Sequence, residues 1–577
     1  MKDFDLLIKN GTVIDGRRTP RFVGDVGIKN GRVVAITGKN GLAESRAEEV
    51  IDATDLIVAP GFVDLHTHYD AQIFWDPYCT ISGWHGVTSL VIGNCGFGLA
   101  PCKPEARERA MQALTRNEAV SYPAMKEGIP WDWETFPQYL DSIERTPKGV
   151  NVVSYVGLAP ILGHVMGLEE AKKRRPNSDE LNDMKQIISE ALDAGACGIS
   201  AQYLGEDSIQ RDYDGTPMVT DLMHFDDFAA MASVLRDKGR GAIQCNGVTM
   251  DQCEHLCDVS GANVIYNAIA LECDQHGVKT DAWQDWLAWT DRANQEGRRI
   301  TPQVVVTGID YEFTFEDWNL YDYSPNWRDL CMGSTSERLT KMQDLARRVA
   351  LREEFDNISI NSRYEAAATS LMQFNTLADN TVVMVERDDL QRYEGMTVRE
   401  VAALEQKHPV DAMLDIAVAD SLRTTFATPP NRLNPEHMRE LLLAPHTIPG
   451  ISDGGAHTKF AWFGRYGTEY LVEWVRHHRL VDLEYAHWHL SMVPANYAGL
   501  YDRGVIQVGF PADIIIYDYD QLGWTQPTKV YDMPAGDWRR VSKGVGYRYT
   551  IVNGQITFID GECTNRTPGH LLRNGHA

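Results

Sequence analysis

The sequence predicts an α/β protein built on a (β/α)8 barrel of the TIM type, with a small sheet domain formed by both ends of the chain. Between residues 59 and 508, short apolar runs alternate with stretches of helical periodicity, as in a parallel β/α architecture. Two helical stretches, 181–194 and 225–235, each precede a strand-like run, as crossover helices do. The eight candidate barrel strands are 62–66, 89–93, 152–158, 198–203, 242–246, 264–269, 301–306 and 447–451.

Asn-Gly pairs predict hairpins at both termini, because these residues accept the positive φ of tight turns. Asn10-Gly11, Asn30-Gly31 and Asn553-Gly554 each interrupt a strand-like run. We expect these strands to pair in one domain made of residues 1–58 and 509–577, which leaves 59–508 for the barrel. Three unrelated hairpins are the alternative, since Asn-Gly turns are common.

The segment from about 310 to 445 is much longer than a normal connection between barrel elements, so it is predicted to have its own structure. Helical periodicity occurs at 337–352, 397–407 and 410–419. The aromatic run 311–318 could cover a substrate as part of a lid, or it could pack in a core as aromatic residues commonly do.

Composition excludes several classes of partner. The net charge of -26 and the pI near 5.1 argue against binding to nucleic acid or to an anionic membrane surface. No apolar run approaches the roughly 18 residues of a membrane-spanning helix. The ten cysteines show no paired spacing of a disulfide framework. We therefore expect a cytoplasmic protein that acts on a small molecule, with homo-oligomerisation possible.

Two histidines follow the first barrel strand. Side chains at i and i+2 of a strand lie on one face, so His66 and His68 would present two imidazoles to one point, which suits a divalent metal. The alternative is an exposed His-x-His pair that binds no metal. Asp453 ends the last strand-like run among glycines and is the natural third ligand or proton carrier. Cys95 follows the second strand and could be a ligand to a single metal, a relic that no longer binds metal, or a simple packed thiol.

Three motifs carry a resemblance to a known family. PGFVDLHTH at 60–68, TSLVIGNCG at 88–96 and ISDGG at 451–455 resemble the amidohydrolase superfamily, and in particular its N-acyl-D-amino-acid deacylase (D-aminoacylase) branch. The resemblance extends over both ends of the chain and is weaker in its middle part. The resemblance implies that the terminal domain is a composite β-sandwich.

In related deacylases a second metal site uses the strand-two cysteine and histidines that close strands five and six. This sequence carries Gln244 and Asn246 at the end of strand five and Asn267 at the end of strand six instead. We therefore expect one metal per chain rather than two, with Zn²⁺ as the first choice, although imidazole and carboxylate ligands also serve manganese and iron.

The predicted chemistry is hydrolysis of an amide bond in an N-acyl amino acid or related N-acyl compound. A catalytic zinc typically keeps three protein ligands and a water whose pKa falls to about 7. With His66, His68 and Asp453 as ligands, that water is the nucleophile, and Asp453 acts as general base and then as general acid toward the leaving amine. Alternatives are hydrolysis of a cyclic amide, carbamate or ester, a decarboxylation, or a non-catalytic binding or assembly role.

Several polar residues at the same strand ends of the predicted barrel are candidates for substrate binding. The amides could hydrogen-bond a substrate carbonyl or carboxylate, or they could be structural. His457 and Arg465 follow the aspartate loop, and a guanidinium matches a carboxylate fork. Leu158 stands where related deacylases usually carry a histidine, which favours a more hydrophobic acyl or aromatic substrate. The full set of candidates is Gln202, Gln244, Asn246, Asn267, His457 and Arg465.

Overall fold

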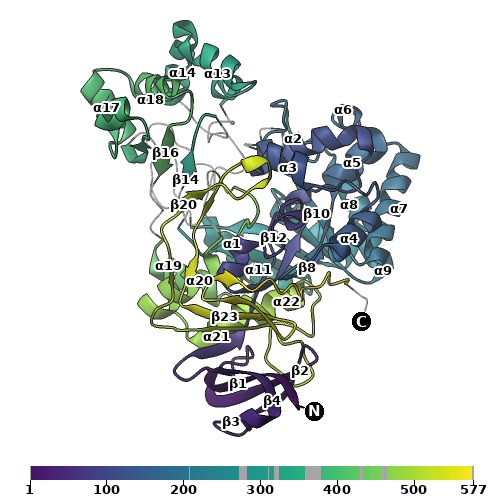
Figure 1. The fold of residues 1–577 in the computed structure, drawn as a ribbon. Coiled ribbons are helices and arrows are strands. Elements are labelled where there is room, and N and C mark those ends of the chain that lie inside the picture. Colours follow the sequence, from purple (N-terminus) through teal and green to yellow (C-terminus); the bar gives the residue numbers. More distant parts are fainter. Residues whose placement is uncertain are drawn as a thin grey trace.

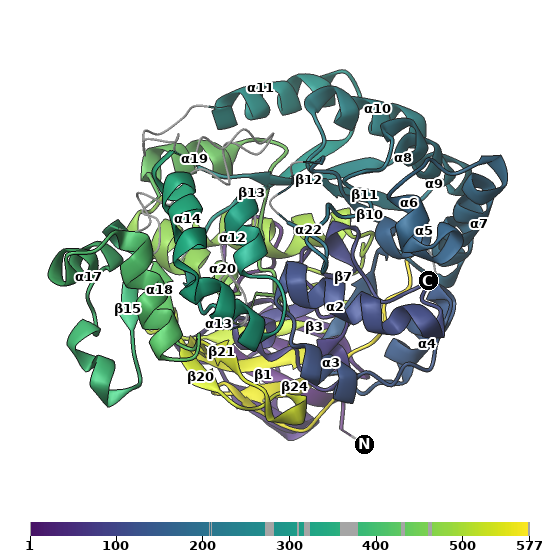
Figure 2. The same ribbon diagram turned by 90° about the horizontal axis from the view of Figure 1, so that it is seen from above.

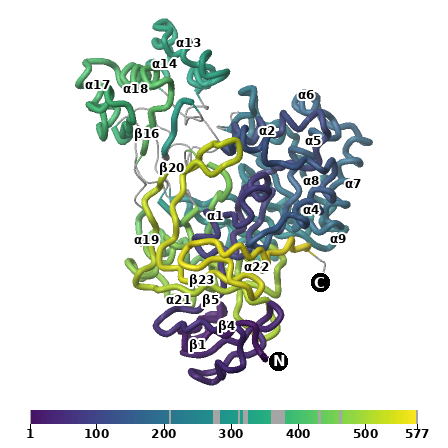
Figure 3. The backbone as a smooth tube through the Cα atoms, in the orientation of Figure 1, coloured from purple at the N-terminus to yellow at the C-terminus, as the bar shows by residue number. Residues whose placement is uncertain are grey.

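The computed structural model describes residues 2–206, 208, 210–271, 282–308, 311–316, 324–357, 379–428, 433–457, 459 and 464–574. Its largest sheet contains strands from both ends of the chain, in the order β25-β24-β23-β18-β5-β1-β2-β3, with β4 added on β1. The ends meet where β5 (Ile57–Pro60) pairs with β18 (Ile514–Tyr517) (Figures 1 and 3). The other members are β1 (Phe4–Val13), β2 (Phe22–Lys29), β3 (Arg32–Gly38), β4 (Ala47–Asp52), β23 (Tyr547–Val552), β24 (Gln555–Ile559) and β25 (Glu562–Cys563).

Two of the three Asn-Gly pairs form the predicted hairpin turns. Asn30-Gly31 joins β2 to β3 and Asn553-Gly554 joins β23 to β24, and both residues of each pair have positive φ. The hairpin predicted at Asn10-Gly11 is wrong, because β1 runs straight through it. Asn10 has a φ of 59° and lies at a register shift between β1 and β2, so the pair forms a bulge rather than a turn.

The central strands form two parallel sheets. One has the order β6-β7-β8 and the other β17-β13-β12-β11-β10-β9. They approach each other at the split third strand, where β8 (Asn151–Ser154) and β9 (Val156–Gly157) are separated by one residue, and at a parallel bridge between Thr67 and Gly454. The remaining strands are β6 (Phe62–Asp64), β7 (Val87–Ile92), β10 (Gly198–Gln202), β11 (Ala242–Asn246), β12 (Asn263–Ile269), β13 (Ile300–Val305) and β17 (Ile448–Gly450).

Helices cover the outside of these strands (Figure 2). In α7 (Ser178–Ala194) the residues Met184, Ile188, Ala191 and Leu192 recur at helical spacing and are buried. A capping box between Asn177 and Glu180 starts this helix, and Gly195 ends it with a φ of 110°. The predicted helix 225–235 is two helices, α8 (Phe225–Ala232) and α9 (Val234–Lys238). Further helices on this side are α10 (Met250–Ser260) and α11 (Ala282–Gln295).

The long segment after β13 has its own sheet, β14 (Tyr311–Phe313), β16 (Thr425–Thr428) and β15 (Val382–Met384), and its own hydrophobic core. Phe313 and Phe315 are buried in that core, which supports the packing interpretation for them, whereas Trp318 lies outside the described residues. The helix predicted at 337–352 is broken at residue 344. The helices are α12 (Pro325–Leu330), α13 (Thr335–Gln343), α14 (Leu345–Asn357), α17 (Val398–Glu405) and α18 (Pro409–Ala419).

Among the described residues, no helix combines the length and the apolar character needed to span a membrane.

Candidate metal centre

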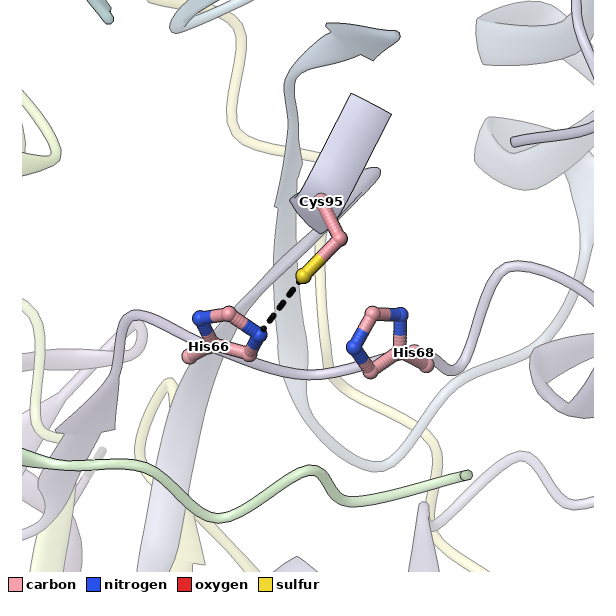
Figure 4. A group of neighbouring side chains, drawn as sticks. All are labelled: His66, His68 and Cys95. Atoms are coloured by element: carbon pink, nitrogen blue, oxygen red, sulfur yellow. Dashed lines mark hydrogen bonds between the residues drawn. The ribbon is translucent and has the colours of Figure 1, made fainter. Parts of the chain in front are cut away.

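His66, His68 and Cys95 form a compact buried cluster beyond the carboxyl ends of β6 and β7 (Figure 4). One ligand atom from each lies within 4.8 Å of the others, and the two imidazole rings are 5.3 Å apart. Cys95 sits in a short turn after β7, with its Sγ 3.4 Å from His66 Nε2. Gly93 precedes it at a φ of 76°, where a Cβ would approach the Tyr155 carbonyl oxygen to 2.4 Å, so the tight turn requires glycine.

Asp453 completes this cluster from the loop that follows β17. Its Oδ1 lies 3.3 Å from His66 Nε2 and 3.6 Å from His68 Nε2. The position is fixed by the backbone, because the Asp453 N–H donates to the His66 carbonyl at 3.2 Å and the Ser452 hydroxyl donates to the same oxygen. The Asp453 side chain is 18% exposed, against 3% and 4% for the two histidines, so the site opens toward the aspartate.

Glu118 is a site residue that the sequence analysis missed. It is the last residue of α2 (Arg107–Glu118) and is only 1% exposed. Its Oε2 lies 3.7 Å from His68 Nε2 and 3.0 Å from His457 Nε2, and His457 Nε2 is 3.8 Å from Asp453 Oδ2. No local pattern marks a glutamate at the end of a polar helix as functional, so only its burial beside the histidines reveals it.

The electrostatics of the cluster favour bound positive charge. Burial lowers the pKa of His66 to about 4, which keeps that imidazole neutral. Burial also disfavours charge on Glu118, but His68 and His457 outweigh it and lower the carboxyl pKa. Burial also disfavours charge on Asp453, but the neighbouring His68, His66 and His457 together outweigh it and lower the carboxyl pKa.

His68 balances part of this negative charge. Burial would lower its pKa, but the charge of Glu118 and the interaction with Asp453 raise that pKa well above the usual value. Burial raises the pKa of the Cys95 thiol to about 12, so this group becomes a thiolate only beside a cation. Two buried carboxylates therefore flank the cluster, and its imidazole, carboxylate and thiol donors suit zinc and similar divalent metals.

The predicted amide candidates divide into two groups. Gln244 and Asn267 touch the cluster directly: the Cys95 N–H donates to Gln244 Oε1 at 2.6 Å, and the Asn267 amide contacts His66 Nδ1. Contact at Nδ1 leaves His66 Nε2 facing Cys95 and Asp453, the orientation of a metal-binding nitrogen.

The other candidates have different surroundings. Gln202 is fully buried and donates to Asp221 at 2.9 Å, while Asn246 ends β11 with part of its side chain exposed. Arg465 is buried in an ion pair with Glu469 at 2.8 Å. His457 alone among the downstream cationic candidates is shown beside Asp453 and Glu118.

A family model described as "Amidohydrolase family" matches residues 49–558 of the chain. An uncharacterized protein of Mycobacterium tuberculosis is 26% identical over 99% of this chain and 96% of its own length. The D-aminoacylase of Alcaligenes xylosoxydans xylosoxydans is 25% identical over 99% and 97%. Among solved structures, N-acyl-D-glutamate deacylase from Bordetella bronchiseptica, complexed with zinc and a phosphonate mimic of the tetrahedral intermediate, has a TM-score of 0.66 at 20% identity, covering 99% of this chain and 100% of that one.

Proposed function

The chain belongs to the amidohydrolase family and is a hydrolase of carbon–nitrogen bonds other than peptide bonds, and from this premise we propose that it cleaves the amide bond of an N-acyl amino acid or a related N-acyl compound. The observation that carries the proposal is the convergence of His66, His68, Cys95 and Asp453 in one buried cluster at strand ends. The similarity to D-aminoacylase and to N-acyl-D-glutamate deacylase supports the same substrate class.

His66, His68 and Asp453 would hold one divalent metal, with Cys95 as a further ligand. When bound, such a metal polarises the substrate carbonyl and makes water acidic enough to attack it near neutral pH. We favour Zn²⁺, the metal named for the Bordetella deacylase. We favour one ion per chain, because amides rather than histidines close β11 and β12.

Asp453 carries the proton in this proposal. Its Oδ1 faces the two histidines, whereas Oδ2 lies on the side of His457. Oδ2 is therefore the oxygen that would accept the proton of the attacking water and return it to the leaving nitrogen. His457, held by Glu118 at 3.0 Å, would keep Oδ2 oriented and stabilise its negative charge before each transfer.

The finer architecture is part of the same proposal. The two parallel sheets would close into one (β/α)8 barrel through the split strand at β8 and β9 and the Thr67–Gly454 bridge. The terminal sheet, from 1–58 and 509–577, would be a composite β-sandwich beside a barrel at 59–508, with the insertion at about 310–445. The strand β5 extends to Pro60, which favours a boundary at Gly61 rather than residue 59.

The experiment that tests the function measures metal content and activity together. Protein purified without chelator is compared with Asp453→Asn and Cys95→Ala by elemental analysis and by release of the amine from N-acetyl-D- and N-acetyl-L-amino acids. We expect about one metal per chain in the natural protein. Loss of that metal in Asp453→Asn but not in Cys95→Ala supports the three-ligand site.

An exposed replacement, Asp520→Asn, serves as the matched control and should keep both metal and activity. About two metals per chain would overturn the single-metal assignment. A protein that binds no metal under any loading condition, or that releases no amine when metal is bound, would overturn the proposed function.

A further inference from the structure

A cavity lies near the metal centre, at the same end of the parallel strands. Its volume is about 280 Å³. It is enclosed by the loop that follows β7, by α2, by the start of α5 (Leu158–Met166) after β9, and by residues 218–219 after β10. The helices α2 and α5 are neighbours in Figure 2. All four walls follow the carboxyl ends of strands, where barrel enzymes build their active sites.

The wall formed by α2 is mostly apolar, and its one cationic member, Arg109, is paired with buried Asp212 at 2.7 Å. Ala110, Ala113, Leu114 and Asn117 recur at helical spacing and all line the cavity. The two alanines leave space that larger side chains would fill. The facing walls are also apolar, with Phe97, Pro101, Ala159, Pro160, Met218 and Val219. Such a lining is typical of a pocket that holds an apolar group of a small molecule.

The inner end of this cavity adjoins the metal centre. Asn117 lines the cavity and the next residue, Glu118, contacts His68. Leu114 lies four residues, about one helical turn, before Glu118, a rise of about 6 Å. On the opposite wall, Phe97 is two residues after Cys95. The cavity and the metal centre therefore share two structural elements, the end of α2 and the turn after β7.

Asn117 adds one polar feature to this inner end. It is 3% exposed, and its amide nitrogen donates to Met218 Sδ at 3.0 Å. Its Oδ1 has no hydrogen-bond partner within the part of the chain that the structure describes. A buried acceptor without a partner is costly, so a ligand N–H, such as that of an amide, would be favoured here.

We propose that this cavity is the acyl pocket and that the enzyme prefers N-acyl substrates with an apolar chain longer than acetyl, an inference that rests on the proposed amide hydrolysis. An acyl chain carries no charge, and the residues at the inner end, Phe97, Gly98, Leu114 and Asn117, carry none either. The alternative occupant is the amino-acid side chain of the substrate. That side chain is attached next to the substrate carboxylate, and the carboxylate would require a cation at the inner end of the cavity. Lys103 and Glu105, which are exposed, lie at the solvent side of the cavity.

The test uses N-acetyl, N-butyryl, N-hexanoyl and N-octanoyl derivatives of one amino acid. We expect kcat/KM to rise by about threefold to fourfold per added methylene until the pocket is full. Ala113→Phe fills the pocket and should lower the hexanoyl-to-acetyl ratio of kcat/KM by about tenfold or more. Ala110→Leu is a milder filling that should lower the ratio less.

Gln112→Phe is the matched control, because Gln112 is on the same helix but does not line the cavity. It should leave the ratio unchanged. If the natural enzyme hydrolyses acetyl and hexanoyl substrates equally, or if Ala113→Phe leaves the ratio intact, the acyl pocket is refuted while the proposed function stands.

If no N-acyl substrate is hydrolysed, the proposed function fails and the pocket is tested by calorimetric titration with hexanoate and acetate. Hexanoate binding that Ala113→Phe abolishes would still support the pocket. Absence of hexanoate binding would refute it.

Discussion

Replacing Glu118 by glutamine removes a buried negative charge without changing the size of the side chain. Glu118 Oε2 is 3.7 Å from His68 Nε2, and the raised pKa of His68 means that this imidazole is protonated in the metal-free protein at neutral pH. At the effective dielectric constant of about 20 that describes protein sites, two unit charges at this distance attract by about 4 kcal/mol. Removing one partner of a buried pair typically costs about 3–5 kcal/mol.

We therefore expect Glu118→Gln to lower the free energy of unfolding of the metal-free protein by about 3–5 kcal/mol. Urea unfolding followed by circular dichroism measures this change, with an unchanged m-value as the check that the unfolding transition is comparable. Glu108→Gln is the matched control, because Glu108 is an exposed glutamate on the same helix and should change stability by less than about 0.5 kcal/mol.

A double-mutant cycle identifies the pair responsible. In a His68→Asn background, the loss caused by Glu118→Gln should shrink but not vanish, because one of the two imidazoles that Glu118 contacts is gone while His457 remains at 3.0 Å. The reasoning is refuted if Glu118→Gln is no more destabilising than Glu108→Gln, or if the His68→Asn background leaves its cost unchanged.

Two further substitutions test a buried carboxylate, Asp221, and a partly buried one, Asp537, away from the metal centre. Burial raises the pKa of Asp221 to about 7, so the folded protein binds a proton that the unfolded chain releases near pH 4, and stability falls as pH rises between these values. Asp221→Asn removes this fall. The free energy of unfolding of the variant, relative to that of the natural protein, should therefore increase by about 4 kcal/mol from pH 4 to pH 7 in urea titrations. A difference that does not change with pH would contradict this. Asp537 accepts hydrogen bonds from Lys459 at 3.0 and 3.1 Å. Asp537→Asn should therefore lower the free energy of unfolding by about 2 kcal/mol in the same assay. A loss no larger than that caused by the exposed replacement Asp520→Asn would show that the ion pair is unimportant.

The members of the candidate metal cluster were predictable because their geometry is local. His66 and His68 are two residues apart at a strand end, and that spacing alone places both rings on one side. Asp453 was predictable because the carboxyl ends of parallel strands meet at one edge, whatever their separation in sequence. The turns at Asn30-Gly31 and Asn553-Gly554 followed from the backbone preferences of those residues.

Residues whose role depends on packing between distant segments were not predictable. Glu118 ends a helix that resembles a surface helix, and it becomes part of the site only because the loop after β7 carries that helix over the histidines. Arg465 was a reasonable anion-binding candidate in sequence, yet the fold buries it against Glu469. Asn10-Gly11 has the sequence of a turn, but pairing of β1 on both sides keeps the strand continuous.

The sequence by itself therefore determined the family, the strand–helix order, the pairing tendency of the two termini and four members of the candidate metal cluster, His66, His68, Cys95 and Asp453. Each of these depends on a repeat or a motif within a few residues. Only the tertiary structure decided that Glu118 and His457 pair beside Asp453, that Gln244 and Asn267 contact the cluster, and that small residues on α2 leave a cavity next to it. These features depend on the burial of side chains from separate elements, and burial is a property of the packed molecule rather than of any short stretch of sequence.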